Sequence, residues 1–237
     1  KSTQFIDVYY QTLKSIFAEM NILFSELEQI DFEHCSIEKI NDVLRNLSTL
    51  NHTLWYHAFL PDKFDPAGGT LLNDEIKQHK LGLTSEQCSA MIKSLELNFV
   101  EASDLALLTI ALTIKKTKKE HYESAIKKAI HEYLKTFYFV KNSWAIVQFL
   151  NESDIAPILR EMLARSSEQL EQEIKKITSI SQLRKKEIAS LEKKHTMPLS
   201  LKNIFHLYRV LTLIRDERKE YVLKSNHFLE LCAQRLA

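Results

Sequence analysis

The chain has 237 residues and a net charge of +1, and 45% of its residues are hydrophobic while 27% are charged. This composition excludes an intrinsically disordered chain, and no apolar run approaches the roughly 20 residues that a membrane span needs. Only 3 glycines occur, where average usage gives about 16, which disfavours hairpin-rich sheets and glycine-built phosphate loops. We therefore predict an all-α fold: an elongated bundle of about seven or eight helices without a sheet.

Heptad-spaced apolar residues mark the first predicted helix, over residues 6–30. Its a and d positions are Ile6, Tyr9, Leu13, Ile16, Met20, Leu23, Leu27 and Ile30. Tyr10, Phe17 and Phe24 repeat every seven residues beside this seam and widen it. A wider stripe favours burial in a helical bundle over an exposed two-stranded coiled coil.

A second helix is predicted over residues 37–58, with Ser36 as its N-cap. The connection of about five residues predicts an antiparallel hairpin at the N-terminus. A loop is expected at residues 61–69, which hold two of the four prolines and two of the three glycines. A short helix over residues 71–81 should then end at Gly82, a residue suited to a left-handed C-cap.

Capping residues and apolar spacing predict the remaining helices. A helix over residues 84–98 should begin with a capping box of Thr84 and Gln87, and a helix over 105–114 should be capped by Ser103 or Asp104. A helix is also expected over 122–150. Two more are expected over 153–194, capped by Ser153 or Asp154 and bent at 178–181, and over 198–237. The helix at 105–114 is apolar on all sides, which predicts a central position. We predict a single domain over residues 1–237, a piece of a larger protein, with sub-bundles 1–100 and 101–237 as the alternative.

The sequence holds no motif of a nucleotide, hydrolase or zinc-protease site. The cysteines Cys35, Cys88 and Cys232 are widely spaced, so we interpret them as reduced packing residues in a reducing, cytoplasmic compartment. We predict no cofactor, no metal and no catalytic residue that the sequence can name. An enzyme whose site is assembled from distant residues stays an alternative, because such sites leave no local motif.

Charge is divided unevenly along the chain. Residues 1–110 hold 8 basic and 16 acidic residues, whereas residues 111–237 hold 24 and 15. One lysine cluster is predicted to bind anionic lipid headgroups, such as phosphoinositides, or an acidic partner; it consists of Lys115, Lys116, Lys118, Lys119, Lys127 and Lys128. Basic groups at 184–194 and 215–219 are interleaved with acids and are interpreted as solvated faces. Nucleic acid is not expected as a partner, because aromatic residues do not accompany the lysines.

The leading functional hypothesis is a non-catalytic protein–protein interaction module of a larger protein. One form of this hypothesis is a secreted bacterial effector that binds a host factor. The expected loop would present its apolar residues to the partner, or fold them back onto the end of the bundle. The candidate contact residues are Phe59, Leu60, Phe64, Pro66 and Leu71. The alternatives are a peripheral membrane domain that uses the basic half, and the enzyme described above. The oligomeric state does not follow from the sequence.

Overall fold

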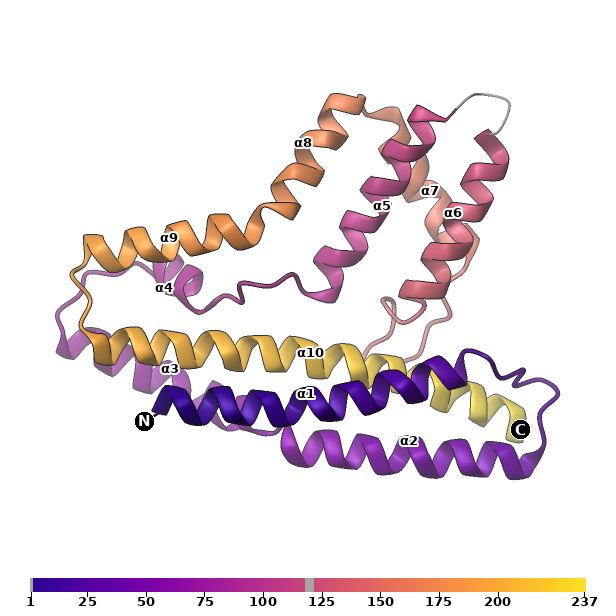
Figure 1. Cartoon of the computed structure of the whole chain (residues 1–237), viewed down its shortest axis with the longest axis horizontal. Helices are drawn as coiled ribbons and strands as arrows, with labels where there is room; N and C mark the ends of the chain where they lie inside the picture. The colour runs from indigo at the N-terminus through magenta and orange to yellow at the C-terminus, as the bar shows by residue number, and fades with distance from the viewer. Residues whose placement is uncertain (1, 118–121) are drawn as a thin grey trace. The chain divides into compact units, whose positions relative to one another are not determined.

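The computed structural model describes residues 2–117 and 122–237, and this part of the chain is all-helical without a strand. The all-α prediction is therefore confirmed. The helices are α1 (Ser2–Leu27), α2 (Ile37–His57), α3 (Leu60–Gln78), α4 (Ser85–Ile92), α5 (Phe99–Lys116), α6 (Tyr122–Phe137), α7 (Glu152–Ala164), α8 (Ser167–Thr178), α9 (Ile180–Lys194) and α10 (Leu199–Leu236) (Figure 1). None of these helices combines the length and the hydropathy that a bilayer span needs.

Contacts between Cα atoms group the chain into two compact units. Unit 1 comprises Lys1–Glu96 together with Ser181–Ala237, and unit 2 comprises Leu97–Ile180. Unit 2 is therefore inserted into the sequence of unit 1. The single-domain organisation of the whole chain stays a prediction.

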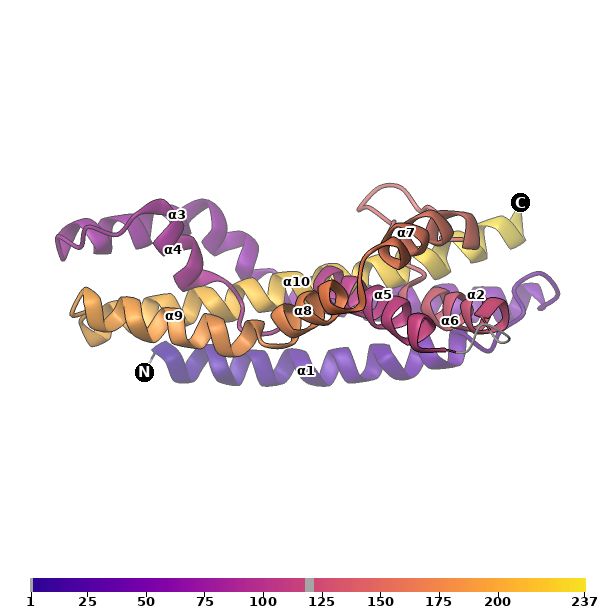
Figure 2. The ribbon, with the colours of Figure 1, turned by 90° about the horizontal axis from the view of Figure 1, so that it is seen from above.

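Unit 1 is organised around α10, which contacts α1, α2, α3 and α4. Figures 1 and 2 both show α1 alongside α10. The heptad seam explains this packing, because Ile6, Leu13 and Met20 are all buried. The flanking aromatic residues are buried as well, and Phe17 stacks on Tyr221 of α10 with ring centroids 4.5 Å apart. The seam thus binds α1 to a bundle, as the width of its apolar stripe predicted.

A second part of the unit 1 core joins α3, α4, α9 and α10. Its buried members are Leu72, Ile76, Met91, Ile188, Leu191, Met197, Leu201, Phe205 and Tyr208. The shared cluster stabilises the short helix α4, together with α3 and α9, against the long helix α10. The predicted bend at 178–181 is confirmed, because α8 ends at Thr178 and α9 begins at Ile180.

Unit 2 is built around α5, which contacts α6, α7 and α8. Leu107, Ala111 and Ile114 of α5 are buried in a core shared with these three helices. The hydroxyls of Ser103 and Tyr133 lie 2.5 Å apart and link α5 to α6 inside the unit. The central position predicted for the apolar helix at 105–114 is confirmed within this unit.

Helix starts follow capping boxes, some of which the sequence analysis missed. The Ser36 cap and the Thr84–Gln87 box are confirmed. The caps predicted for α5 and α7 are wrong, because Asn98 and Asn151 cap these helices, each in a box with the acidic residue three positions later. A further box at Ser166 begins α8 and divides the predicted helix over 153–194. Each of these boxes was readable in the sequence.

The predicted helix over 122–150 is wrong in its second half, because α6 ends at Phe137. The buried side chain of Asn142 accepts a hydrogen bond from the backbone N–H of Gln148 at 2.9 Å. The Ser143 hydroxyl accepts another from the N–H of Ile146 at 3.0 Å. These side chains satisfy backbone groups locally, in competition with the helical ladder.

The loop predicted at 61–69 is also wrong, because these residues belong to α3. Pro61 lies in the first turn, where a missing N–H costs no hydrogen bond, and Asp62 favours a helix N-terminus. The helix ends at Gln78 instead of before Gly82, and the left-handed residue is Lys80, with φ of 49°. The N–H of Leu81 donates to the carbonyl of Ile76 at 3.1 Å, which completes a Schellman C-cap.

Candidate protein-binding surface

The predicted lysine cluster is divided by its contacts in unit 2. Lys115 donates to the carbonyl of Leu163 at 2.8 Å, and Lys116 pairs with Glu171 at 2.9 Å. Both lysines therefore help to hold α5 against its neighbours. Lys118 and Lys119 lie outside the described residues. Lys127 and Lys128 are exposed on α6 and form no ion pair with a described residue.

Of the residues predicted to contact a partner, Phe59 and Leu60 lie at the start of α3. Phe59 is 46% exposed, directly after the C-terminal end of α2, and Leu60 is half-buried. Phe64, Pro66 and Leu71 belong to the helical stretch of α3, and their side chains lie outside the described part of the chain. These five residues therefore belong to a helix junction and to α3 and not to a loop, and their contact with a partner stays a prediction.

Arg218 of α10 holds this helix junction in place. Only 3% of Arg218 is exposed. Its guanidinium donates to the carbonyl of Ala58 at 2.7 Å and to both carboxylate oxygens of Asp62 at 2.6 and 2.7 Å. The same guanidinium lies 4.7 Å from the ring centre of Trp55. One buried cation thus joins the end of α2 and the start of α3 to α10 through bidentate, charge-assisted bonds.

Three aromatic side chains are exposed at this anchored junction, and we call them the junction patch: Trp55, Tyr56 and Phe59. Tyr56 is 69% exposed. Near this patch, the Tyr9 hydroxyl of α1 donates to the carbonyl of His57 and ties α1 to the end of α2. The guanidinium of Arg218 also helps to hold the pKa of Asp62 below its usual range, chiefly through their hydrogen bonds. The patch therefore lies beside the ion pair of Asp62 and Arg218.

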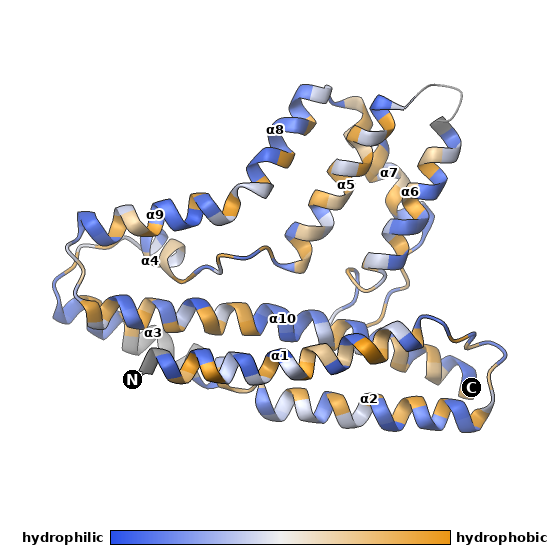
Figure 3. Cartoon of the chain, in the orientation of Figure 1, coloured by the Kyte–Doolittle hydropathy of each residue, from blue (hydrophilic) through white to orange (hydrophobic). Residues whose placement is uncertain are grey.

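A groove runs between the outer faces of α1 and α2 in unit 1. We call it the α1–α2 groove; its volume is about 370 Å³ and its lining residues are Glu19, Ile22, Leu23, Glu26, Arg45, Asn46, Thr49 and Leu50. Figure 3 shows hydrophobic residues along α1 and at intervals on α2. The groove is open to solvent, and one of its walls is the 63% exposed side chain of Ile22.

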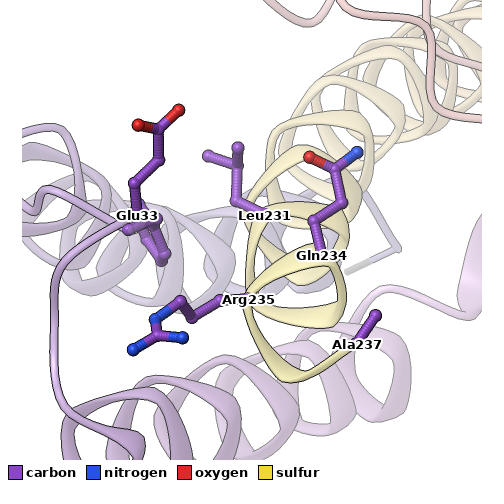
Figure 4. Close-up of a pocket in the computed structure, with 6 residues that line it drawn as sticks. Glu33, Leu231, Gln234, Arg235 and Ala237 are labelled. Carbon is purple, nitrogen blue, oxygen red and sulfur yellow. The ribbon is translucent and has the colours of Figure 1, made fainter.

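A second pocket of about 470 Å³ lies at the C-terminal end of α10 (Figure 4). It brings Glu33 near Arg235 and Gln234, with Phe32 and Leu231 as its apolar part. The Arg235 Nε donates to the carbonyl of Cys35 at 3.3 Å, so this cation is engaged in joining α10 to the segment before α2. No lining residue is a nucleophile beside a general base, so the pocket does not favour an active site.

Among the carboxylic acids of the described residues, Glu217 has the most perturbed pKa, and it lies between packed helices of unit 1. Burial raises the pKa of Glu217 to about 7, and the like charges of Glu96 and Glu220 add to this rise. The Tyr10 hydroxyl donates to Glu217 Oε1 at 2.9 Å and opposes it, as does the charge of Lys14. Neither pocket described above includes Glu217, so we interpret it as part of the core of unit 1.

In the described part of the chain, no group of three His, Cys, Asp or Glu side chains could hold a metal ion. Comparison with protein-family models, with curated proteins and with solved structures gives no match.

Sequence reasoning missed two buried arginines that lie in the basic groups interpreted as solvated. Arg184 of α9 donates to the carbonyl of Ser94 at 2.8 Å and to that of Glu96 at 3.1 Å. Arg218 has the anchoring role described above. Their acceptors are mostly backbone carbonyls from distant segments, which leave no signal in the sequence near the arginines. The exposed apolar residues Phe5, Val8 and Ile22 of α1, by contrast, follow helical spacing, which is readable in the sequence.

Proposed function

We propose that this chain is a non-catalytic protein–protein interaction module that binds a protein partner through the junction patch. The observation that carries the proposal is the exposure of Trp55, Tyr56 and Phe59 on a junction that Arg218 fixes. Tryptophan and tyrosine are enriched among residues that dominate binding energy. Because Arg218 contacts the ring of Trp55 and holds the backbone at Ala58, binding loses little conformational entropy at Trp55 and in the backbone of the junction.

The packing of unit 1 supports this proposal. The start of α1 meets the end of α2 at Tyr9 and His57, while Ile22 and Arg45 line the same groove. These contacts support an antiparallel hairpin of α1 and α2. We propose this hairpin, and an elongated bundle that contains it, as the architecture of the module. Such a hairpin presents a fixed platform for a partner, as loops and junctions on rigid scaffolds do.

Site-specific photo-crosslinking in cells tests the proposal. A photoreactive amino acid replaces Tyr56 in one variant and Lys127, on α6 of unit 2, in the matched control. We expect a discrete crosslinked protein at position 56 and none at position 127. The captured protein is then purified, and its affinity for the wild-type chain is compared with its affinity for Phe59→Asp.

The proposed function requires that Phe59→Asp weakens binding of the purified partner by about tenfold or more, because an exposed aromatic side chain that the partner would cover is replaced by a charge. Equal affinity for the variant and the wild type overturns the proposal. A product at position 127 alone overturns it too and favours the basic surface instead.

The exposed Lys127 and Lys128 support one alternative, a peripheral membrane function. Flotation with phosphoinositide vesicles at low salt tests it, with Lys127→Glu/Lys128→Glu as the matched variant. Flotation of the wild type that this variant loses favours the membrane function. Absence of flotation removes it.

A further inference from the structure

α1 carries two apolar stripes, and the chain covers one of them. The inner seam is buried, whereas Phe5, Val8 and Ile22 on the outer side are 62%, 61% and 63% exposed. The outer stripe advances by three and four residues, as the inner one does; its positions are Phe5, Val8, Thr12, Ser15, Glu19 and Ile22. A helix with apolar stripes on two sides has room for neighbours on both. Glu19 and Ile22 of this outer stripe also line the α1–α2 groove.

Several polar positions on the outer side of α1 and on α2 are short hydroxyl side chains whose hydrogen bonds are made within their own helix. Thr12 donates to the carbonyl of Val8 at 3.3 Å, and Ser15 donates to that of Thr12 at 2.8 Å. On α2, the Thr49 hydroxyl donates to the carbonyl of Arg45 at 2.9 Å, and Thr53 repeats this pattern with Thr49. Covering these residues therefore breaks no hydrogen bond, and their small size permits the close approach of another helix.

The charges at the Ile22 end of the groove define the occupant further. Glu19 and Glu26 are exposed on either side of Ile22, and neither forms an ion pair with a described residue. Arg45, the one basic residue among those that line the groove, is paired with Asp42 at 3.6 Å. A helix that covers Ile22 removes both carboxylates from part of their water, so it must supply cations to them.

A second copy of unit 1 would not satisfy this requirement. Its own groove brings Glu19 and Glu26 again, and the one basic residue that lines that groove, Arg45, is already paired with Asp42. The complementary occupant has apolar residues at helical spacing and basic residues beside them, as in helix-in-groove recognition.

We infer that the α1–α2 groove, together with the rest of the outer stripe of α1, binds a single amphipathic helix of a partner protein, with the apolar face of that helix on Ile22, Val8 and Phe5 and with its lysine or arginine residues facing Glu19 and Glu26. The inference rests on the proposed function, because it assigns a structure and a charge to the partner of that module.

Fluorescence anisotropy with synthetic helical peptides tests the inference. The probe is a labelled peptide of roughly three heptads with leucine at positions a and d and lysine at e and g. The matched probe has glutamate in place of lysine. The proteins are the wild type, Ile22→Glu, the double variant Glu19→Lys/Glu26→Lys, and the control Leu199→Glu, which alters an exposed leucine at the start of α10. Circular dichroism verifies that each variant is folded.

We expect the wild type to bind the lysine peptide at least about tenfold more tightly than the glutamate peptide at about 0.15 M salt. Ile22→Glu should weaken binding of the lysine peptide about tenfold, and the double charge reversal should invert the preference between the peptides. Leu199→Glu should leave both affinities unchanged.

Absence of saturable binding, or equal binding by the wild type and Ile22→Glu, overturns the inference. So does a peptide preference that the double charge reversal leaves unaltered. Failure here is distinct from failure of the proposed function, because a partner crosslinked at position 56 whose binding Phe59→Asp weakens would retain the module and exclude only the groove.

Discussion

The substitution Glu217→Gln isolates the free-energy cost of ionising a buried carboxyl group between α1 and α10. The pKa of Glu217 is raised from 4.5 to about 7 in the folded chain, first by burial. The folded state therefore favours the protonated acid. Stability from this site is fully present below pH 4.5 and is lost as the pH rises towards 7. The amide that the substitution introduces stays neutral and can still accept the hydrogen bond of Tyr10.

The magnitude follows from the two pKa values. At about 1.36 kcal/mol per pKa unit, the change from 4.5 to about 7 corresponds to about 3 kcal/mol. Because part of the Glu217 side chain keeps contact with water, we expect about half of this value, roughly 1.5 kcal/mol at pH 8. A constant offset from the new amide leaves the pH dependence unchanged.

Urea unfolding, followed by circular dichroism between pH 5 and pH 8, measures this effect. The free energy of unfolding of Glu217→Gln, relative to the wild type, should increase over this range and level off near pH 8. Glu28→Gln alters an exposed glutamate just after α1 and serves as the control. A difference between Glu217→Gln and the wild type that is the same at pH 5 and pH 8 would refute the reasoning.

Three further predictions concern stability, and urea unfolding checks each. Thr196, a β-branched residue with φ of 46°, should gain about 1 kcal/mol on replacement by glycine, whereas a lower stability would show that its backbone is unstrained. Arg218→Met should cost about 2–3 kcal/mol, because the buried carbonyl of Ala58 loses its donor; an unaltered unfolding free energy would contradict this anchor. Leu170→Ala should cost about 3 kcal/mol by opening a cavity in the core of unit 2, and a cost below about 1 kcal/mol would contradict that packing.

The elements that sequence reasoning predicted well are those whose signal is local and repeated. The seam through Leu13 and Met20 repeats over nearly four heptads, so a single polar residue in it would not change the helix prediction. The caps at Ser36 and Thr84 depend on a side chain and a backbone group three residues apart. Such short-range patterns are specified by the sequence alone, and tertiary contacts do not need to be known.

The elements that sequence reasoning predicted poorly depend on competition between local hydrogen bonds or on partners that are distant in the sequence. Around Asn142 and Ser143, apolar spacing predicts a helix, but side-chain bonds to the backbone prevail. In α3, the prolines and glycines predict a loop, whereas the ionic contact of Asp62 with Arg218 holds the first turn in place. Because 156 residues separate these two charges, no window of the sequence contains their interaction.

The candidate site depends both on a local sequence pattern and on contacts between distant segments. The outer stripe of α1 was readable from the spacing of Phe5, Val8 and Ile22, but whether a stripe is covered depends on which helices reach it. In unit 1, α10 and α2 contact α1, and the exposed fractions of these three side chains show that the outer stripe is left open.

The two stripes of α1 also explain why a binding surface can be maintained on this helix. The inner seam, buried against α10, fixes the conformation of α1 before any partner arrives. The outer stripe therefore needs no ordering of the backbone on binding, and the main conformational cost is that of the partner. Apolar residues on the outer side reduce solubility, and Glu19 and Glu26 beside Ile22 offset this while the groove is empty. In the binding mode proposed above, the same two carboxylates would favour basic helices over acidic ones, so one pair of charges would serve both the free and the bound state.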